Sequence, residues 1–285
     1  MANTRALMLA LVLSSTLAAP VMGQSPRPDT VVVQSGELKL HALLWRPEGR
    51  GPFPAVLFNH GSGHATGTDM SGRRDQRHPE LLGPVFIKHG YILLYLFRRG
   101  DGLSAGQGIP AGDRMDSASA ASGQVARNQI QLRLLETDEM SDVLAGLTFL
   151  RARADVQPAR LAVVGVSFGG SLTLLVAERD STLRAAVAFA VAGYSWERSP
   201  PLRARLLAAV ARTVVPTFFI HAANDYSVAS GKALGAEMAR LGKPSRVEIY
   251  PAVGRTAEEG HAFVDLGLRS WEPDVFDFLD EHLRP

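Results

Sequence analysis

The segment 165–169 reads GVSFG and places Ser167 between two glycines. An apolar, β-branched run precedes it at 160–164, and an apolar run with helical character follows at 171–178. A serine at such a strand-to-helix turn sits on a strained backbone that exposes its hydroxyl. The helix behind it directs free N–H groups at any negative charge formed there. We therefore predict that Ser167 is a nucleophile.

A serine hydroxyl is a weak nucleophile at neutral pH and needs a base within hydrogen-bond reach. Histidine is the usual base, because its pKa lies close to neutral. His261 is the best candidate, because it follows the last predicted strand and so returns to the edge of the sheet where Ser167 lies. We expect it in a loop, where Gly260 lets the imidazole turn towards the serine. The alternative is a solvated histidine beside Glu258 and Glu259.

The base in turn needs a carboxylate that fixes its tautomer and stabilises its protonated form. Asp225 follows a predicted parallel strand and is therefore expected at the same edge of the sheet. The alternative role of Asp225 is to cap the helix that follows, and the alternative acid is Glu197, after the preceding strand. The chain order Ser167, Asp225, His261 is the order of the α/β-hydrolase fold.

Acyl transfer also needs hydrogen-bond donors for the oxyanion that forms during the reaction. The backbone N–H of Phe168, directly after the serine, is the first donor expected. The second is expected in the glycine-rich segment after the strand at 55–58, where we predict the amide of Ser62, with Gly61 as the alternative. We expect His60 to form structural hydrogen bonds rather than to take part in catalysis.

The residue types argue against a metal or a cofactor. The chain has no cysteine, which excludes disulfides, thiolate catalysis and cysteine-ligated metals. His60 and His64 share a segment that is glycine-rich rather than helical, and no third ligand is placed near them. We therefore expect no metal and no cofactor. Arg98, Arg99 and the segment Tyr194–Trp196 are candidates for the pocket wall or for purely structural roles.

The elements that must position these residues alternate between strand and helix from residue 55 onward. This alternation predicts a parallel sheet covered by helices on both faces. Alternating apolar residues at 30–34 and 37–45 predict an N-terminal β-hairpin. Further strands are expected at 55–58, 91–97, 160–164, 183–191, 214–220 and 245–250. Helices are expected at 80–89, 116–151, 171–178, 200–212, 228–241 and 271–283, and long loops at 65–78 and 101–116.

Length and composition indicate a globular protein with one large domain. The chain has 285 residues, of which 46% are hydrophobic and 20% charged, as is usual for a globular fold. The net charge is only +2, and the Lys and Arg residues are scattered, so we expect no nucleic-acid partner.

The first residues have the composition of a secretory signal peptide. A positive start containing Arg5 precedes an apolar run at 6–19, which is too short for a comfortable membrane span, and small residues lead to Gly23. We expect a signal peptide at 1–23 and a single domain at 24–285. The mature protein would be exported, periplasmic or secreted, with no stable membrane anchor; the alternative is an uncleaved anchor.

The segments around these residues resemble the catalytic blocks of dienelactone hydrolase-like α/β hydrolases, which are related to prolyl-oligopeptidase-type catalytic domains. The blocks are GVSFGG at 165–170, NDYSV at 224–228, GHAF at 260–263, NHGSG at 59–63 and RRGDGLS at 98–104. The resemblance covers about residues 30–283. It implies an α/β-hydrolase fold with a mostly parallel, doubly wound sheet of about eight strands and helices on both faces.

Two departures from the family bear on the substrate. Dienelactone hydrolases use a cysteine nucleophile, which this chain lacks, and prolyl oligopeptidases carry a large N-terminal propeller, which this sequence does not contain. The resemblance therefore favours a serine hydrolase that cleaves small-molecule carboxylic esters through an acyl-enzyme. The alternatives are a small serine peptidase or amidase and, in another class, a non-catalytic binding protein on the same fold. The oligomeric state stays open.

Overall fold

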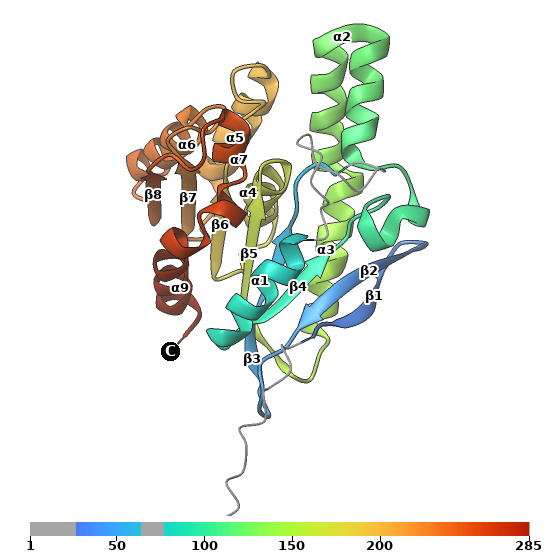
Figure 1. Ribbon diagram of the computed structural model, residues 1–285, viewed down its shortest axis with the longest axis vertical. Coiled ribbons are helices and arrows are strands. Elements are labelled where there is room, and N and C mark those ends of the chain that lie inside the picture. Colours follow the sequence, from blue (N-terminus) through green and yellow to red (C-terminus); the bar gives the residue numbers. More distant parts are fainter. Residues whose placement is uncertain (1–26, 64–76, 285) are drawn as a thin grey trace, which may run out of the picture.

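The computed structural model describes residues 27–63 and 77–284. They contain one eight-stranded sheet with the order β1-β2-β4-β3-β5-β6-β7-β8 (Figure 1). β1 pairs antiparallel with β2, and β2 with β4, whereas all other neighbours are parallel. The predicted hairpin and the mostly parallel sheet are confirmed. The strands are β1 (Asp29–Ser35), β2 (Leu38–Trp45), β3 (Phe53–Asn59), β4 (Ile92–Leu96), β5 (Val156–Val166), β6 (Ala185–Phe189), β7 (Thr217–Ala222) and β8 (Ser245–Tyr250).

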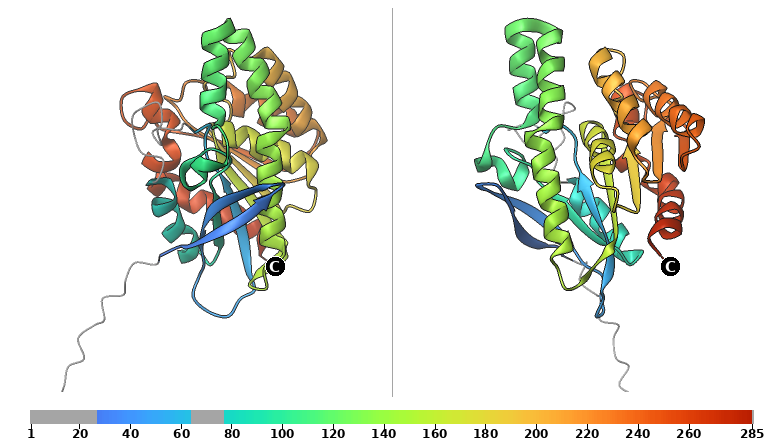
Figure 2. Two further views of the ribbon diagram at one scale, coloured as in Figure 1. Left: turned by 90° about the vertical axis from the view of Figure 1, so that its right-hand side faces the viewer. Right: turned by 180° about the vertical axis from the view of Figure 1, so that it is seen from behind.

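Helices cover both faces of this sheet, as the two views in Figure 2 show. One face packs against α2, α3, α4, α5 and α6, and the other against α1, α8 and α9. The helices are α1 (Arg77–Lys88), α2 (Ala111–Glu136), α3 (Asp138–Arg151), α4 (Phe168–Arg179), α5 (Pro200–Arg212), α6 (Ala229–Arg240), α7 (Ala257–His261), α8 (Phe263–Leu266) and α9 (Leu268–Leu283), with a 3-10 helix, η1 (Gly102–Gln107).

The central strands are apolar along their length because alternate side chains enter two separate cores. In β3, Ala55 and Leu57 belong to the core beneath α3 and α4, while Val56 and Phe58 belong to the core beneath α1 and α9. This arrangement explains why short, continuous apolar runs in the sequence correctly predicted the strands that carry the site.

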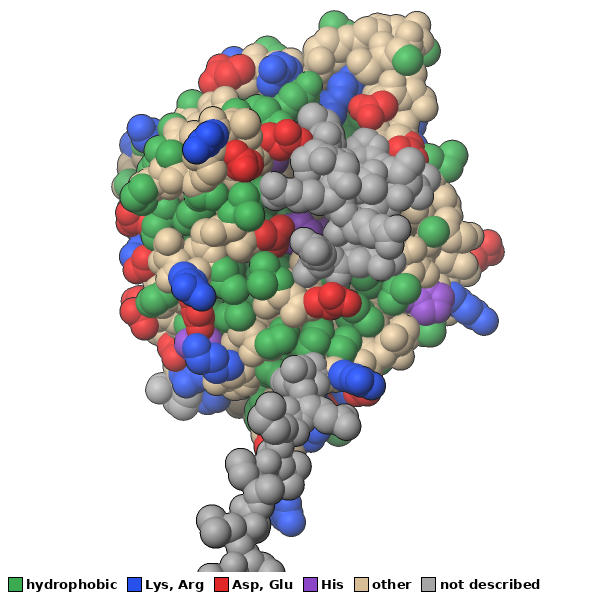
Figure 3. Space-filling model, viewed as in Figure 1, with side chains coloured by type: hydrophobic (Ala, Val, Ile, Leu, Met, Phe, Trp, Pro, Cys, Tyr) green, Lys and Arg blue, Asp and Glu red, His purple; other side chains and the backbone are tan. Residues whose placement is uncertain are grey.

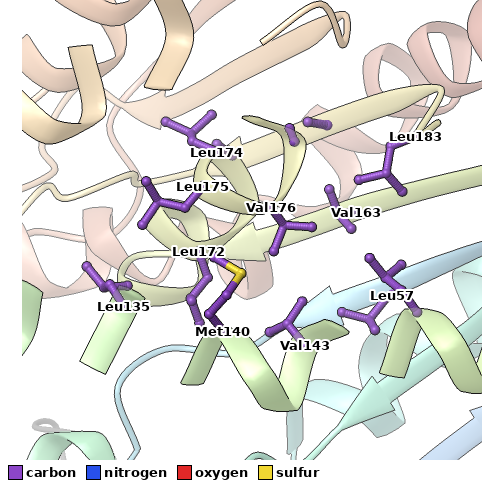
Figure 4. Packing of buried hydrophobic residues seen from close by; sticks show 14 of the residues in the cluster. Leu57, Leu135, Met140, Val143, Val163, Leu172, Leu174, Leu175, Val176 and Leu183 are labelled. Carbon is purple, nitrogen blue, oxygen red and sulfur yellow. The ribbon is translucent and has the colours of Figure 1, made fainter. Parts of the chain in front are cut away.

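Figure 4 shows the first of these cores from close by. Leu57 of β3 and Val163 of β5 lie on the sheet side, and Met140 and Val143 of α3 lie opposite, next to Leu172 of α4. All five side chains are at most 1% exposed. The helix that follows Ser167 is therefore fixed by packing on the sheet and on α3.

The stretch 116–151 is not one continuous helical segment, in contrast to the sequence-based expectation. Ser122 and Gly123 have non-helical backbone angles inside α2, and Gly123 has a φ of 75°. Glycine adopts such an angle at low cost, so the chain reverses and α2 becomes a helical hairpin that projects from the body (Figure 1). A second break at Thr137 separates α2 from α3. The loop expected at 101–116 contains η1 and the start of α2.

Several expectations concern residues outside the described ranges. The signal peptide at 1–23, His64 and most of the loop at 65–78 fall there. Within 27–63 and 77–284, no helix combines the length and the apolar character needed to cross a membrane. Acidic and basic side chains are interspersed over the face shown in Figure 3, in agreement with the scattered charges of the sequence.

Candidate active site

Ser167 occupies the sharp turn between β5 and α4. Its backbone has φ 58° and ψ −115°, and its N–H donates to the carbonyl oxygen of Phe189 at 2.9 Å. Such angles in a residue other than glycine cost about 1–3 kcal/mol and persist only where the surroundings impose them. The turn therefore has the strained geometry expected from the GVSFG sequence.

The two glycines of this turn are required by close approach of the backbone. A Cβ on Gly165 would lie 2.4 Å from the carbonyl oxygen of Gly169, and a Cβ on Gly169 would lie 2.0 Å from that of Asn59. Both distances are shorter than any van der Waals contact. Only glycine lets α4 begin so close to β5 and to the segment after β3.

The structure brings Ser167, His261 and Asp225 together at the carboxyl edge of the parallel strands. His261 Nε2 lies 2.8 Å from Ser167 Oγ, and His261 Nδ1 lies 2.7 Å from Asp225 Oδ1. An ionised carboxylate only accepts hydrogen bonds, so Nδ1 carries the hydrogen. His261 Nε2 is then free to accept the hydrogen of the Ser167 hydroxyl.

His261 ends a short helix, α7, rather than lying in a loop as expected. Thr256 and Glu259 form a capping box that starts this helix, with each side chain bonded to the backbone of the other residue. Gly260 also has a different role from the one expected. A Cβ there would lie 2.5 Å from the backbone of Asn224, so glycine permits close packing of α7 on the loop after β7.

Asp225 accepts hydrogen bonds from three sides. Its partners are His261 Nδ1, His221 Nδ1 at 2.7 Å and the backbone N–H of Tyr226 at 2.7 Å. Burial raises the pKa of Asp225, but the hydrogen bonds from the two imidazoles outweigh it and lower the pKa to about 2. Capping of α6 is not its role, because the N-cap residue is Val228.

The alternative acid, Glu197, does not reach His261. Its carboxylate accepts a hydrogen bond from Ser227 at 3.3 Å, lies 4.0 Å from Arg203, and is 61% exposed. Asp225 is thus the carboxylate that the structure places on His261.

Sequence reasoning missed His221 and the role of Asn224. His221 belongs to β7, where a histidine in an apolar run gives no indication of a partner four residues later. Asn224 donates through Nδ2 to the carbonyl oxygens of Val253 (2.8 Å) and Thr256 (2.7 Å), and its Oδ1 accepts from the N–H of Val253 at 3.0 Å. These bonds fix the loop that leads into α7 and His261.

The amides of Phe168 and Ser62 border the same pocket as Ser167. Neither amide donates a backbone hydrogen bond to another of the described residues. The carbonyl oxygen of Ser62 accepts from the N–H of Gly112 at 2.9 Å, which ties its loop to the start of α2. Gly61, the alternative donor, borders the pocket as well.

His60 is buried and bonded within the protein, as expected. Its Nε2 accepts from the backbone N–H of Arg98 at 3.2 Å, and its Nδ1 lies 3.0 Å from a carboxylate oxygen of Asp101. Burial is the main cause that lowers the pKa of His60 well below its usual value, and the positive charge of nearby Arg98 is the second. The imidazole is therefore neutral and structural.

Arg98 and Arg99 do not border the pocket. Arg98 pairs with Glu139 at 2.6 Å in the interior, and Arg99 pairs with Asp142 at 2.7 Å. Trp196 is buried in the core at 3% exposure. Of the residues considered for the pocket wall, only Tyr194 and its neighbour Ser195 border it.

The pocket beside Ser167 has aromatic, polar and charged walls. Tyr194 and Tyr226 meet edge to face with ring centroids 5.4 Å apart, and Tyr226 lies 5.1 Å from the His261 ring. A second wall comes from α2 and a third from the region of α7 and α8. Besides His261, the polar and charged members of these two walls are Arg127, Gln131, Glu258 and Asp265. Within the described ranges, no three His, Asp or Glu side chains cluster in a way that could hold a metal ion.

The fold and this site define the class of protein. A serine at the turn after β5, an aspartate after β7 and a histidine after β8, on a mostly parallel eight-stranded sheet, define an α/β hydrolase of the serine type. The sequence profile of the X-Pro dipeptidyl-peptidase (S15) family matches residues 35–211. This is more than half of the chain, and the chain belongs to this family. The match includes Ser167 but ends before Asp225 and His261.

Comparisons with individual proteins agree with this class. The chain is 29% identical over 161 residues to YtaP of Bacillus subtilis (strain 168), a protein named as a hydrolase. The match covers 54% of this chain and 48% of YtaP. The chain thus spans about half the length of this curated relative.

Solved structures resemble the fold at low sequence identity. The acylaminoacyl peptidase of Pyrococcus horikoshii matches 92% of this chain and 42% of its own, with a TM-score of 0.64 and 17% identity. A Pyrococcus furiosus esterase matches 91% of this chain and 92% of its own, with a TM-score of 0.63 and 15% identity. The expected α/β hydrolase related to prolyl-oligopeptidase-type enzymes is confirmed.

Proposed function

We propose that this chain is a serine hydrolase that cleaves carboxylic esters of small molecules without a cofactor. One observation carries the proposal: hydrogen bonds of 2.8 and 2.7 Å link Ser167 Oγ through His261 to Asp225, and Ser167 borders a pocket. A serine made nucleophilic in this way performs acyl transfer.

In the proposed reaction, Ser167 Oγ attacks the ester carbonyl carbon while His261 Nε2 takes the hydroxyl proton. The amides of Phe168 and Ser62 stabilise the oxyanion of the tetrahedral intermediate. When the intermediate collapses, the C–O bond to the alcohol breaks and the alcohol leaves with the proton from His261. Water then attacks the acyl-enzyme with His261 as base, which releases the acid and restores Ser167.

Ester hydrolysis is the least demanding reaction for this arrangement. An amine is a poorer leaving group than an alcohol, so a triad that acylates from an amide also acylates from an activated ester. The esterase from Pyrococcus furiosus supports the assignment because it is similar in length to this chain: the match covers 91% of this chain and 92% of the esterase. The matched part of the acylaminoacyl peptidase is less than half of that protein.

The test is intact-mass analysis after incubation with a fluorophosphonate, followed by assays on a series of 4-nitrophenyl esters. The wild type should gain a single adduct and hydrolyse esters. Ser167→Ala should gain none and should lose roughly 10⁴- to 10⁶-fold in kcat. Ser141→Ala is the matched control, because Ser141 is an exposed residue of α3 that bonds to Thr137. Ester turnover retained in Ser167→Ala would contradict the proposal.

A second candidate function is cleavage of peptides or amides. The S15 family name supports it, and so does Gln131, which borders the pocket. Its Nε2 donates to Ser195 Oγ at 3.1 Å, whereas its buried Oε1 has no hydrogen-bond partner among the described residues. That oxygen can accept a peptide N–H, and Arg127, one helical turn earlier, can donate to a peptide carbonyl. Turnover of peptide 4-nitroanilides at rates comparable with esters would favour this function.

We also infer export of the protein, from the composition of residues 1–23. Expression of the full chain in a bacterial host with a secretion pathway should release a mature form that begins at Gln24, measured by intact mass. Recovery of full-length chain from the membrane fraction would favour the uncleaved anchor instead.

A further inference from the structure

Asp225 is held by a second histidine that does not reach the pocket. His221 Nδ1 lies 2.7 Å from Asp225 Oδ2, and His261 Nδ1 lies 2.7 Å from the other oxygen, Oδ1. The side chains of His221 and Asp225 are both 0% exposed, whereas that of His261 is 19% exposed. Each oxygen of the carboxylate thus accepts a hydrogen bond from one imidazole. One of these imidazoles is fully buried and the other is partly exposed.

The surroundings of His221 determine which nitrogen carries its hydrogen. Because the carboxylate only accepts, Nδ1 must be the donor. Nε2 then accepts in the neutral ring, and the hydroxyl of Ser230 in α6 lies 3.4 Å from it. His221 is therefore oriented at both ends, by Asp225 and by Ser230.

Packing leaves the His221 ring and the carboxylate little freedom. A Cβ on Gly231 of α6 would lie 2.7 Å from His221 Cδ2 and 2.8 Å from its Nε2. A Cβ on Gly193 would lie 2.8 Å from Asp225 Oδ1. Because Gly231 and Gly193 have no side chain, the backbone packs directly against His221 and Asp225. This close packing restricts the movement of both side chains.

A carboxylate can rotate about its Cβ–Cγ bond unless both oxygens are anchored. Oδ1 faces His261 and the N–H of Tyr226, and Oδ2 is bonded to His221. Without His221, Oδ2 would be a buried carboxylate oxygen with no donor among the described residues, and the group would turn to share its remaining donors. Any such turn would misdirect the bond that sets the tautomer and the orientation of His261.

We propose that His221 is a positioning residue for the hydrolytic reaction, which acts by fixing the plane of the Asp225 carboxylate on His261. This inference rests on the proposed function, since it assigns His221 a part in the same reaction. His221 touches neither Ser167 nor the pocket, and no proton needs to pass to it.

The experiment compares His221→Leu, which removes the donor at similar volume, with His221→Asn, whose amide can donate from nearly the position of Nδ1. Titration with a fluorophosphonate first counts the competent sites, and kcat is expressed per site. The kcat of His221→Leu should fall about 10- to 100-fold with KM changed less than 2-fold. His221→Asn should recover most of that loss. A purely structural role predicts equal kcat per competent site in both variants, and this result would overturn the proposal.

Proton NMR gives a readout that does not depend on turnover. The hydrogen bonds from His261 and His221 to Asp225 should each give a downfield imidazole N–H resonance in the wild type. In His221→Leu one resonance should vanish and the other should shift, whereas an unchanged His261 resonance would overturn the proposal. A wild type that hydrolyses no ester would contradict the proposed function and leave this readout valid. If His221→Leu does not fold, Gly231→Ala, which displaces the ring, should show the same loss of kcat and the same shift; unchanged values would overturn the proposal.

Discussion

Arg98 and Glu139 form an ion pair enclosed within the protein, with Nε and Oε2 2.6 Å apart and each side chain 1% exposed. Arg98 also donates through Nη2 to the carbonyl oxygen of His60 at 3.0 Å, and its guanidinium lies 5.7 Å from the centre of the Phe168 ring. One buried cation thus contacts both segments that carry the proposed oxyanion donors. We expect this pair to hold the loop after β3 against the start of α4.

Removing one partner of the Arg98–Glu139 pair should destabilise the folded protein. Glu139→Gln leaves Arg98 buried without a counter-charge and should lower the free energy of unfolding by about 3–5 kcal/mol. The double variant Arg98→Met/Glu139→Met should be closer to the wild type in stability, because no unpaired charge remains. Urea unfolding measures both.

The double variant also separates stability from positioning. Without Arg98, the carbonyl groups of the loop after β3 lose their anchor, and kcat should fall about 10-fold or more although the protein is folded. A folded double variant with the kcat of the wild type would show that Arg98 does not position the oxyanion loop.

The backbone conformation of Ser167, with φ 58°, should lower the stability of the folded protein. Ser167→Ala and Ser167→Gly both remove the hydroxyl and should be equally inactive. Only glycine adopts φ 58° without steric strain, so Ser167→Gly should unfold at a higher temperature than Ser167→Ala. The relief of strain, about 1–3 kcal/mol, should exceed the extra chain entropy of glycine, about 0.5–1 kcal/mol. Equal melting temperatures in calorimetry would argue against strain at this turn.

The sequence predicted the parts of the site that depend on local patterns. Ser167 is marked by its glycines and by the apolar runs on either side. Asp225 and His261 follow strands whose order along the chain determines which edge they share. These positions could be predicted because a buried parallel strand is apolar and is followed by a loop at its carboxyl end.

The features that were missed depend on contacts between distant segments. The sequence left Arg98 open between the pocket wall and a structural role, because its partner Glu139 lies on a helix 41 residues away. His221 lies directly after the strand predicted at 214–220, and nothing in the local sequence shows that the chain turns to bring Asp225 back to it. The helix that ends at His261 is short and depends on a capping box rather than on apolar periodicity.

Asn224 should control how firmly His261 is held. Asn224→Ala removes three hydrogen bonds to the loop before α7 and should lower the free energy of unfolding by about 1–3 kcal/mol. The loop should then loosen, so kcat should fall while the fluorophosphonate still labels Ser167 slowly. Asn224→Asp keeps the acceptor for the N–H of Val253 but loses the donors, and its kcat should be intermediate. Labelling rates as fast as in the wild type for both variants would contradict this role.

The stability contributed by Asp225 should depend on pH. Its pKa is lowered to about 2 in the folded protein, below its ordinary value of 3.8, so the ionised carboxylate favours the folded state. The contribution, about 2 kcal/mol, is fully present above pH ~4 and is lost as the pH falls from ~4 towards ~2. Asp225→Asn should therefore be less stable than the wild type at pH 6, and the difference should shrink below pH ~4.

Urea unfolding of both proteins from pH 6 to 3 measures this difference directly. Asp277→Asn is the matched control, because Asp277 is exposed and forms no hydrogen bond or ion pair with the residues the structure describes. The stability difference between Asp277→Asn and the wild type should change less over this range than that of Asp225→Asn. A constant difference for Asp225→Asn over the same range would mean that the two imidazoles do not stabilise the ionised carboxylate. Asp225 would then be unsuited to orient and charge-stabilise His261 in the proposed reaction.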